Sequence, residues 1–121
     1  MRVSTTIRFE AMEPSPALRE DIQRHVHKLS QLSPRLTSCD VAVRRSEQRH
    51  VHGNRYLVRV SASLDGVPFQ AGRTPPKDRT HEDAYIAVRD AFDALRRQLE
   101  DHRARRDTVR RAMPEAMSLF H

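Results

Sequence analysis

Arginine is concentrated in two stretches of the chain, and groups of guanidinium ions bind phosphate well because each offers a planar fork of donors. Residues 44–59 contain five Arg and one Glu, a net charge of +4. Residues 96–111 contain seven Arg, two Asp and one Glu, again +4. The whole chain of 121 residues carries only +6, so the remainder is slightly acidic. This uneven distribution favours a polyanionic partner, such as a nucleic acid or a ribosome.

Signatures of catalysis and cofactor binding are not evident in the sequence. The three glycines, Gly53, Gly66 and Gly72, form neither a phosphate-binding loop nor a dinucleotide-binding fingerprint. Ser, His and Asp are present, but no local motif marks a catalytic triad. We therefore expect a protein without enzyme activity, cofactor or small-molecule substrate.

Histidine and cysteine could bind a metal or act as nucleophiles, but their positions argue against both roles. His25 and His27 lie two residues apart in an expected helix, so their side chains diverge. His50 and His52 lie in an expected loop and have no third ligand nearby. Cys39, the single cysteine, falls on the inward phase of a strand, which predicts a packed thiol. We expect no metal site.

The aromatic side chains discriminate between modes of RNA binding. Five of the six fall on positions expected to face the core: Phe9, Tyr56, Phe69, Tyr85 and Phe92. Proteins that stack the bases of single strands need aromatic rings on an open face. Any RNA contact should therefore run from Arg and Lys to phosphate and sugar, and should read shape more than sequence.

Hydrophobic periodicity indicates the elements that position these residues. Residues 3–9 alternate apolar and polar, as a strand with one wet face does. Ser15 and Pro16 suit the start of a helix that ends before Pro34, and its apolar stripe has helical spacing. The stripe consists of Leu18, Ile22, Val26, Leu29 and Leu32.

Three further strands are expected, over residues 39–44, 56–64 and 67–71. Asp65-Gly66 between the last two is a strong signal for a two-residue hairpin turn. Pro68 has no N–H to donate, so the last strand should lie at the sheet edge.

A second helix should follow the breaker segment of residues 72–79. Thr80 with Asp83 resembles a capping box. The apolar stripe ends at Leu99, charge continues to Arg111, and Pro114 should end the helix. Its stripe consists of Tyr85, Val88, Phe92, Leu95 and Leu99.

The expected fold is α+β in the order β-α-β-β-β-α, with both helices packed on one face of a four-stranded mixed sheet. The crossover through the first helix should make the first strand pair parallel, and the other pairs should be antiparallel. We expect one domain over residues 1–106 and a tail over residues 107–121, basic at first and then loose. No apolar run could span a membrane, and the cysteine content suits a reducing compartment, so a cytoplasmic protein is expected.

Three segments resemble the bacterial hibernation promoting factor and ribosome-associated inhibitor family. Residues 17–29 are similar to the first helix of the family, and residues 56–66 to its central hairpin. The most specific match is the Asp83-Ala84-Tyr85-Ile86-Ala87-Val88 segment, followed by Asp93, Leu95 and Arg97-Gln98-Leu99. The resemblance covers residues 1–106 and is to the short forms of the family.

The resemblance implies a protein that binds the small ribosomal subunit and its rRNA, between head and body. There it would overlap the mRNA and tRNA sites and hold idle ribosomes inactive, as in stress or stationary phase. Lys28, Arg97 and Arg103 match basic helix residues of the family. Arg89 and Arg96 depart from it, since acids are usual there, and the loop at residues 73–80 is longer and more basic.

The expected ribosome-binding residues combine the family match with the two arginine-rich stretches. They are Lys28, Arg44, Arg59, Arg89, Arg96, Arg97, Arg103, Arg105 and Arg106. Two alternatives remain open: a stand-alone protein that binds structured RNA, and a stress regulator that acts through protein contacts. Off the ribosome we expect a monomer.

Overall fold

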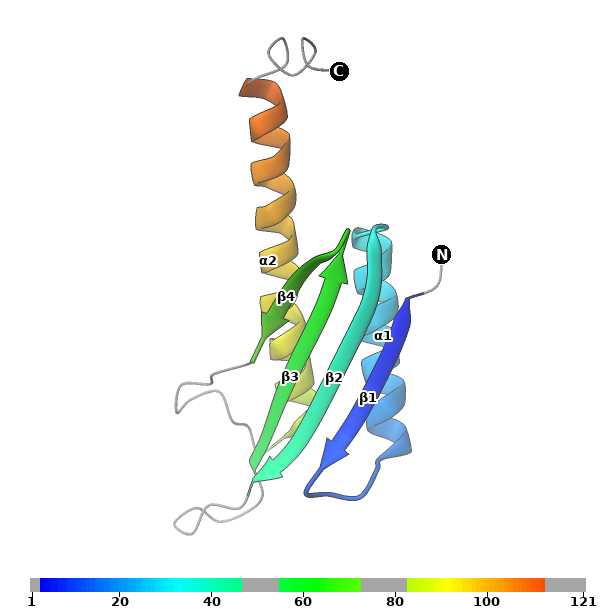
Figure 1. Cartoon of the computed structure of the whole chain (residues 1–121). Helices are drawn as coiled ribbons and strands as arrows, with labels where there is room; N and C mark the ends of the chain where they lie inside the picture. The colour runs from blue at the N-terminus through cyan, green and yellow to red at the C-terminus, as the bar shows by residue number, and fades with distance from the viewer. Residues whose placement is uncertain (1–2, 47–54, 73–82, 113–121) are drawn as a thin grey trace.

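The computed structural model describes residues 3–46, 55–72 and 83–112. It contains four strands and two helices (Figure 1). In chain order they are β1 (Ser4–Glu10), α1 (Pro16–Leu32), β2 (Leu36–Ser46), β3 (Arg55–Leu64), β4 (Val67–Ala71) and α2 (Ala84–Ala112). The expected order β-α-β-β-β-α is therefore confirmed.

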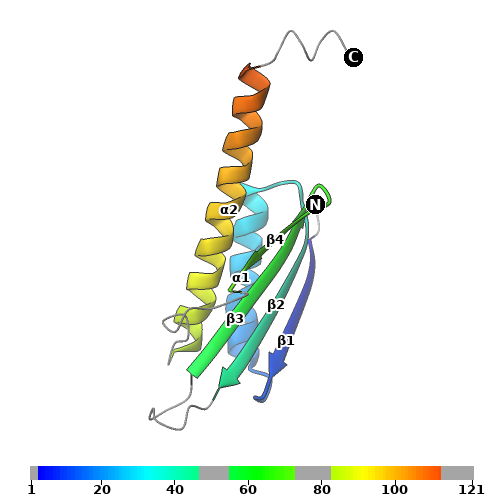
Figure 2. The ribbon, with the colours of Figure 1, turned by 60° about the vertical axis from the view of Figure 1, so that its left-hand side comes forward.

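The four strands form one sheet in the order β1-β2-β3-β4. β1 is parallel to β2, whereas the β2–β3 and β3–β4 pairs are antiparallel. Ile7 lies opposite Val41, which in turn lies opposite Val60, so the apolar residues of three strands share one face. Both helices cover that face, and no described element covers the other, which we call the open face (Figure 2). This is the predicted α+β fold with a mixed sheet.

Helix α1 begins and ends where its sequence predicts. The Ser15 hydroxyl accepts a hydrogen bond from the Leu18 N–H at 3.2 Å, and Pro16 occupies the first turn. At the other end the Ser33 N–H donates to the Leu29 carbonyl. The apolar stripe between these caps is buried through Leu29, but Leu32 is 52% exposed. The last residue of the predicted stripe therefore lies outside the core.

The turn between β3 and β4 has the predicted two-residue form. Asp65 and Gly66 both have positive φ, 52° and 80°, as a hairpin turn of this length requires. Pro68 lies in β4, which is an edge strand, as expected for a residue without an N–H donor.

Helix α2 differs from its prediction at the start. The Asp83 carboxylate accepts a hydrogen bond from the Tyr85 N–H at 2.8 Å, so Asp83 caps the helix, and Thr80 lies outside the described residues. Tyr85 is 45% exposed, and its predicted inward position is wrong. Tyr85 belongs to the first turn of the helix, where the strands cover the ring only in part. One aromatic ring is thus available on the surface after all.

Several sequence-based expectations fall outside the part of the chain that the structure describes. These are the His50 and His52 loop, the long loop at residues 73–80, and the tail at residues 113–121. The expected division at residue 106 lies inside α2, which continues to Ala112. Within the described ranges, neither helix has an apolar stretch that would suffice to cross a bilayer.

Candidate nucleic-acid interface

The sequence of α2 changes character near residue 102, and so does its packing. Among the side chains that the structure describes, the buried residues of the helix precede this point, namely Ala87, Val88, Ala91, Phe92, Leu95 and Leu99. The chain then passes the ends of the strands, and the last turns of the helix project beyond the sheet (Figure 1). We call residues 84–102 the proximal part of α2 and residues 103–112 its distal part.

The distal part is the most basic segment of the described structure. It contains five Arg and one acid, Asp107, a net charge of +4 within ten residues. Arg103 and Arg105 are exposed, and neither forms an ion pair within the described residues. Both guanidinium groups are therefore free to bind phosphate.

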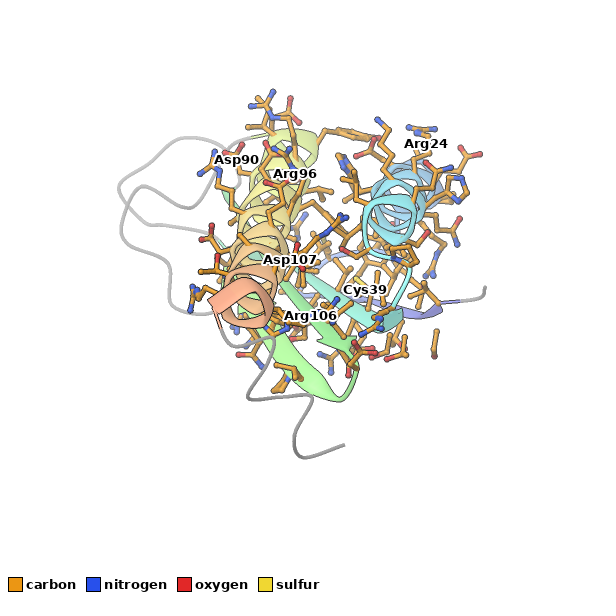
Figure 3. All side chains as sticks on the ribbon, turned by 90° about the horizontal axis from the view of Figure 1, so that it is seen from above. Arg24, Cys39, Asp90, Arg96, Arg106 and Asp107 are labelled. Atoms are coloured by element: carbon orange, nitrogen blue, oxygen red, sulfur yellow. The ribbon has the colours of Figure 1, made fainter. Side chains whose placement is uncertain are left out.

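Arg106 behaves differently from its neighbours. Its side chain is only 35% exposed, and its Nη1 atom lies 3.7 Å from the Asp65 carboxylate in the β3–β4 turn. Asp65 also accepts a hydrogen bond from Arg35 Nη1 at 3.0 Å. Arg106 was expected among the ribosome-binding residues, but it does not extend freely beyond the core, because its side chain turns back toward the strands (Figure 3).

The sequence contained a signal for this orientation of Arg106. The spacing of three and four that defines the apolar stripe continues past Leu99 to His102 and Arg106. These two residues thus occupy the inward side of the helix just beyond the core. His102 accordingly packs against Phe69 of β4, edge to face, with the ring centroids 5.2 Å apart.

Two of the three arginines of the proximal part form ion pairs that partly neutralise them. Arg89 lies 3.5 Å from Asp90, and Arg96 lies 3.9 Å from Asp93 and 3.7 Å from Glu100. The spacing in the sequence allows Glu100 to pair with Arg96 or with Arg103, and the structure has the pair with Arg96. Exposed pairs of this kind are screened by solvent and rearrange easily, so these residues can still contact a polyanion.

Lys28 and Arg97 are both exposed on the helical side of the molecule. Lys28 lies near His25, whose ring stacks on Phe92 of α2 with centroids 5.1 Å apart. Burial lowers the pKa of His25, and the nearby Lys28 charge contributes to the lowering. Lys28 therefore lies near the contact between α1 and α2 that His25 and Phe92 form, which we call the seam.

Arg44 and Arg59 lie on the open face of the sheet, away from both helices. In the strand register Glu10 lies opposite Arg44, and its carboxylate is 3.6 Å from Arg59 Nη2. The nine predicted residues are thus divided between two faces of the molecule. One flat surface cannot include them all, because the sheet separates the two groups.

The ion pair between Arg35 and Asp65, next to the distal part of α2, was not predicted from the sequence. They are thirty residues apart in the chain, and only the antiparallel pairing of β2 with β3 brings them together. No local sequence pattern predicts such a pair.

The prediction that Cys39 is a packed thiol is confirmed. Its side chain is fully buried, and burial raises the pKa of the thiol to about 12.

No cluster of three or more potential metal ligands occurs among the described residues. The arrangement instead offers exposed arginines at one end of a long helix. Their chemistry is the recognition of phosphate, by charge and by bidentate hydrogen bonds.

Comparison with solved structures shows the same fold in two relatives. The structure of a ribosomal subunit interface protein from Coxiella burnetii superposes with a TM-score of 0.65 at 18% identity. The N-terminal domain of Protein Y from Thermus thermophilus superposes with a TM-score of 0.54 at 17% identity. Each likeness covers 84% of this chain and 99% of the other. A search of curated proteins finds no match.

The sequence itself matches a family model over residues 5–107, which is most of the chain. The match runs from β1 into the distal part of α2 and so includes every element of the sheet. The chain belongs to the family described as Sigma 54 modulation protein / S30EA ribosomal protein.

Proposed function

We propose that this protein binds the small ribosomal subunit in the channel used by mRNA and tRNA, and so holds idle ribosomes inactive. The family and the fold support association with ribosomes, since one relative of the same fold is described as a ribosomal subunit interface protein. The observation that carries the proposal is the distal part of α2, which contains five arginines, of which Arg103 and Arg105 are exposed and form no ion pair within the described residues.

The shape of the molecule suits insertion between RNA surfaces. The distal part spans roughly 15 Å of helix at the usual rise per residue. It is a single helix, and its exposed Arg103 and Arg105 lie two positions apart, so their side chains leave the helix on different sides. A helix of this kind can reach phosphates on more than one side of a groove, whereas a flat basic sheet reaches only one. Basic residues also interact favourably with the negative C-terminal end of the helix dipole.

Inhibition would follow from occupancy alone. A protein seated in the channel excludes mRNA and tRNA sterically and needs no chemical step. In cell-free translation, inhibition should therefore scale with the ratio of protein to ribosomes and be complete near equimolar amounts. Full inhibition at strongly substoichiometric protein would contradict this mechanism and would point to turnover.

Sedimentation through a sucrose gradient tests the binding itself. At about 50 mM salt the protein should migrate with small subunits and whole ribosomes, and not with isolated large subunits. Release of counterions from about five phosphate contacts predicts a slope near −4 for log affinity against log salt concentration. Free sedimentation at low salt would refute the proposal. Equal affinity for unrelated structured RNA would instead favour a stand-alone RNA-binding protein.

A further inference from the structure

A pocket lies at the end of the sheet where α1 finishes and the distal part of α2 begins. It has a volume of about 400 Å³, within the range of sites for small ligands, roughly 300–1,000 Å³. One wall is basic and comes from Arg35, Arg103 and Arg106. The rest of the lining is mostly apolar: Leu32, Pro34, Leu64 and Leu99 form what we call the apolar wall, and Gln31, Ser33 and His102 are the other members. We call this site the arginine pocket.

The basic wall of the arginine pocket carries more positive charge than its acid neutralises. Asp65 lies beside Arg35 and Arg106, at 3.0 and 3.7 Å, and one carboxylate is thus shared by two guanidinium groups. Arg103 forms no ion pair within the described residues. The Nε atom of Arg106 is buried and lacks a hydrogen-bond partner there. A buried donor of this kind is costly unless something accepts its hydrogen bond.

The apolar wall suits the flat face of a ring. Leu32 is 52% exposed at the rim, although it ends the apolar stripe of α1. Leu64 and Leu99 are buried beneath it, and Pro34 completes this side. The ring of His102 also lines the pocket and is held in place by its contact with Phe69. The arginine pocket therefore combines apolar side chains and an imidazole ring with three arginines.

We propose that the arginine pocket binds a nucleoside phosphate, with the phosphate on Arg35, Arg103 and Arg106 and the base against Leu32 and His102. A phosphate ion alone would leave the apolar wall in water. A purely apolar ligand would remove the guanidinium groups from water without providing an acceptor. Only a ligand with both parts satisfies both walls.

The same chemistry has two sources, a free nucleotide and an unstacked nucleotide of RNA. The proposal deepens the proposed function, because Arg103 and Arg106 belong to both sites, and it rests on that function only for RNA as the source. Binding is therefore measured on the purified full chain without ribosomes. A failure here leaves ribosome binding untouched, and a failure of ribosome binding leaves the pocket untouched.

The experiment is a calorimetric titration with GDP, AMP, a single-stranded RNA pentanucleotide and inorganic phosphate. We expect one saturable site for at least one nucleotide probe, and affinity at least tenfold above that of inorganic phosphate. Tighter binding of the pentanucleotide would assign RNA as the source, and equal binding would assign the free nucleotide. Both results support the arginine pocket.

Three variants locate the site. Arg35→Gln removes a pocket charge, and Arg105→Gln removes the same charge from an exposed position that does not line the pocket. The first should weaken nucleotide binding about tenfold, as expected for a lost charge-assisted hydrogen bond, and the second less than about twofold. Leu32→Ser keeps every charge and the exposed position should tolerate it, yet nucleotide binding should fall while phosphate binding does not.

Three results would overturn the proposal. One is no saturable binding of any nucleotide probe. Another is equal affinity for inorganic phosphate and nucleotides. The third is an equal loss in Arg35→Gln and Arg105→Gln, with both variants shown to be folded by their thermal unfolding. That last result would mean that nucleotides bind the general positive field of the helix end and not the pocket.

Discussion

The two parts of α2 are one continuous helix, but different physical forces act on them. The proximal part contributes six buried residues to the core, and its three arginines are outnumbered by four acids. The distal part contributes no buried side chain among those described and has five arginines against one acid. Burial holds the first part in place, whereas the second is helical largely as its continuation, with local support from the Arg106–Asp65 pair.

The contrast separates stability from binding within a single element. Changes in the proximal part should act on the free energy of unfolding, because buried apolar area dominates it. Changes at the exposed Arg103 and Arg105 of the distal part should act on affinity for a polyanion, because these charges face solvent. A protein built in this way can present a dense positive charge without placing repulsion inside its core.

The largest effect on stability is expected at Leu95, which is fully buried beneath the sheet. Leu95→Ala should lower the free energy of unfolding by about 2–5 kcal/mol, the usual cost of removing a buried leucine side chain. Arg105→Ala is the matched truncation in the distal part and should change it by less than about 0.5 kcal/mol. Urea unfolding of both variants measures the difference. Similar losses would show that the two parts of the helix are not energetically distinct.

Charge reversal in the distal part should have the largest effect on binding. Arg103→Glu combined with Arg105→Glu should weaken ribosome affinity at least tenfold, or about 1.4 kcal/mol, through lost contacts and new repulsion. Both side chains are exposed and unpaired within the described residues, so the fold should persist. A pelleting assay measures affinity, and circular dichroism checks folding.

The matched control for this variant reverses two exposed arginines elsewhere. Arg8 lies on the open face of the sheet, and Arg19 lies near the start of α1. Arg8→Glu with Arg19→Glu makes the same change in net charge and should retain most of the affinity. If the control loses as much, net charge and not the distal part determines binding. Cys39→Ser, and the pair His50→Ala with His52→Ala, should bind nearly as the parent does.

Periodicity was sufficient to predict the fold because local and global preferences agree in this chain. The alternation in β1, the Ser15 cap and the Asp65-Gly66 turn each specify one local conformation. The order of elements then leaves few arrangements, and the parallel β1–β2 pair follows from the crossover. The prediction that Tyr85 is buried was wrong. The spacing of apolar residues shows which side of a helix faces the core, but it does not show how far the sheet extends along that side.

The candidate site was less predictable, because charge in a sequence does not reveal ion pairs between distant segments. Arg103 and Arg106 belong to the same arginine-rich stretch, yet one is exposed and the other contacts Asp65. Arg44 and Arg59 were predicted to bind the ribosome together with arginines of the helices. The sheet, however, separates these two residues from both helices. Continuing the stripe beyond Leu99 would have identified Arg106 but not its partner.

A smaller effect is expected at the contact that ties the distal part to the strands. Asp65→Asn removes the carboxylate shared by Arg35 and Arg106, and asparagine tolerates the positive φ of the turn. Because these groups are partly exposed, the loss of stability should be at most about 1 kcal/mol. Amide exchange in residues 103–108 should become faster, and nucleotide affinity of the arginine pocket should rise. Unchanged exchange would show that the pair does not restrain the helix end.

The smallest effect is expected from His25, which joins α1 to the proximal part by stacking on Phe92. Burial lowers the pKa of His25 below the ordinary histidine value of 6.5, although the nearby charge of Asp21 acts to raise it. The unfolded chain therefore binds a proton first as the pH falls. The contribution of neutral His25 to the free energy of unfolding is fully present above the pKa of the unfolded chain. It is lost as the pH falls from about 6.5 to the lowered pKa of the folded protein.

Urea unfolding at a series of pH values should show this loss in the parent and a flatter profile in His25→Gln. The two proteins differ in one titratable side chain, so the difference between the two curves isolates the contribution of His25, including its pairing with Asp21. Ribosome binding by the distal part should not follow the same pH dependence, since His25 lies in the seam between α1 and the proximal part. Parallel unfolding curves would mean that the stacked ring is charged as easily in the folded protein as in the unfolded chain. If ribosome affinity followed the same pH dependence as unfolding, the proximal and distal parts of α2 would be coupled and not independent.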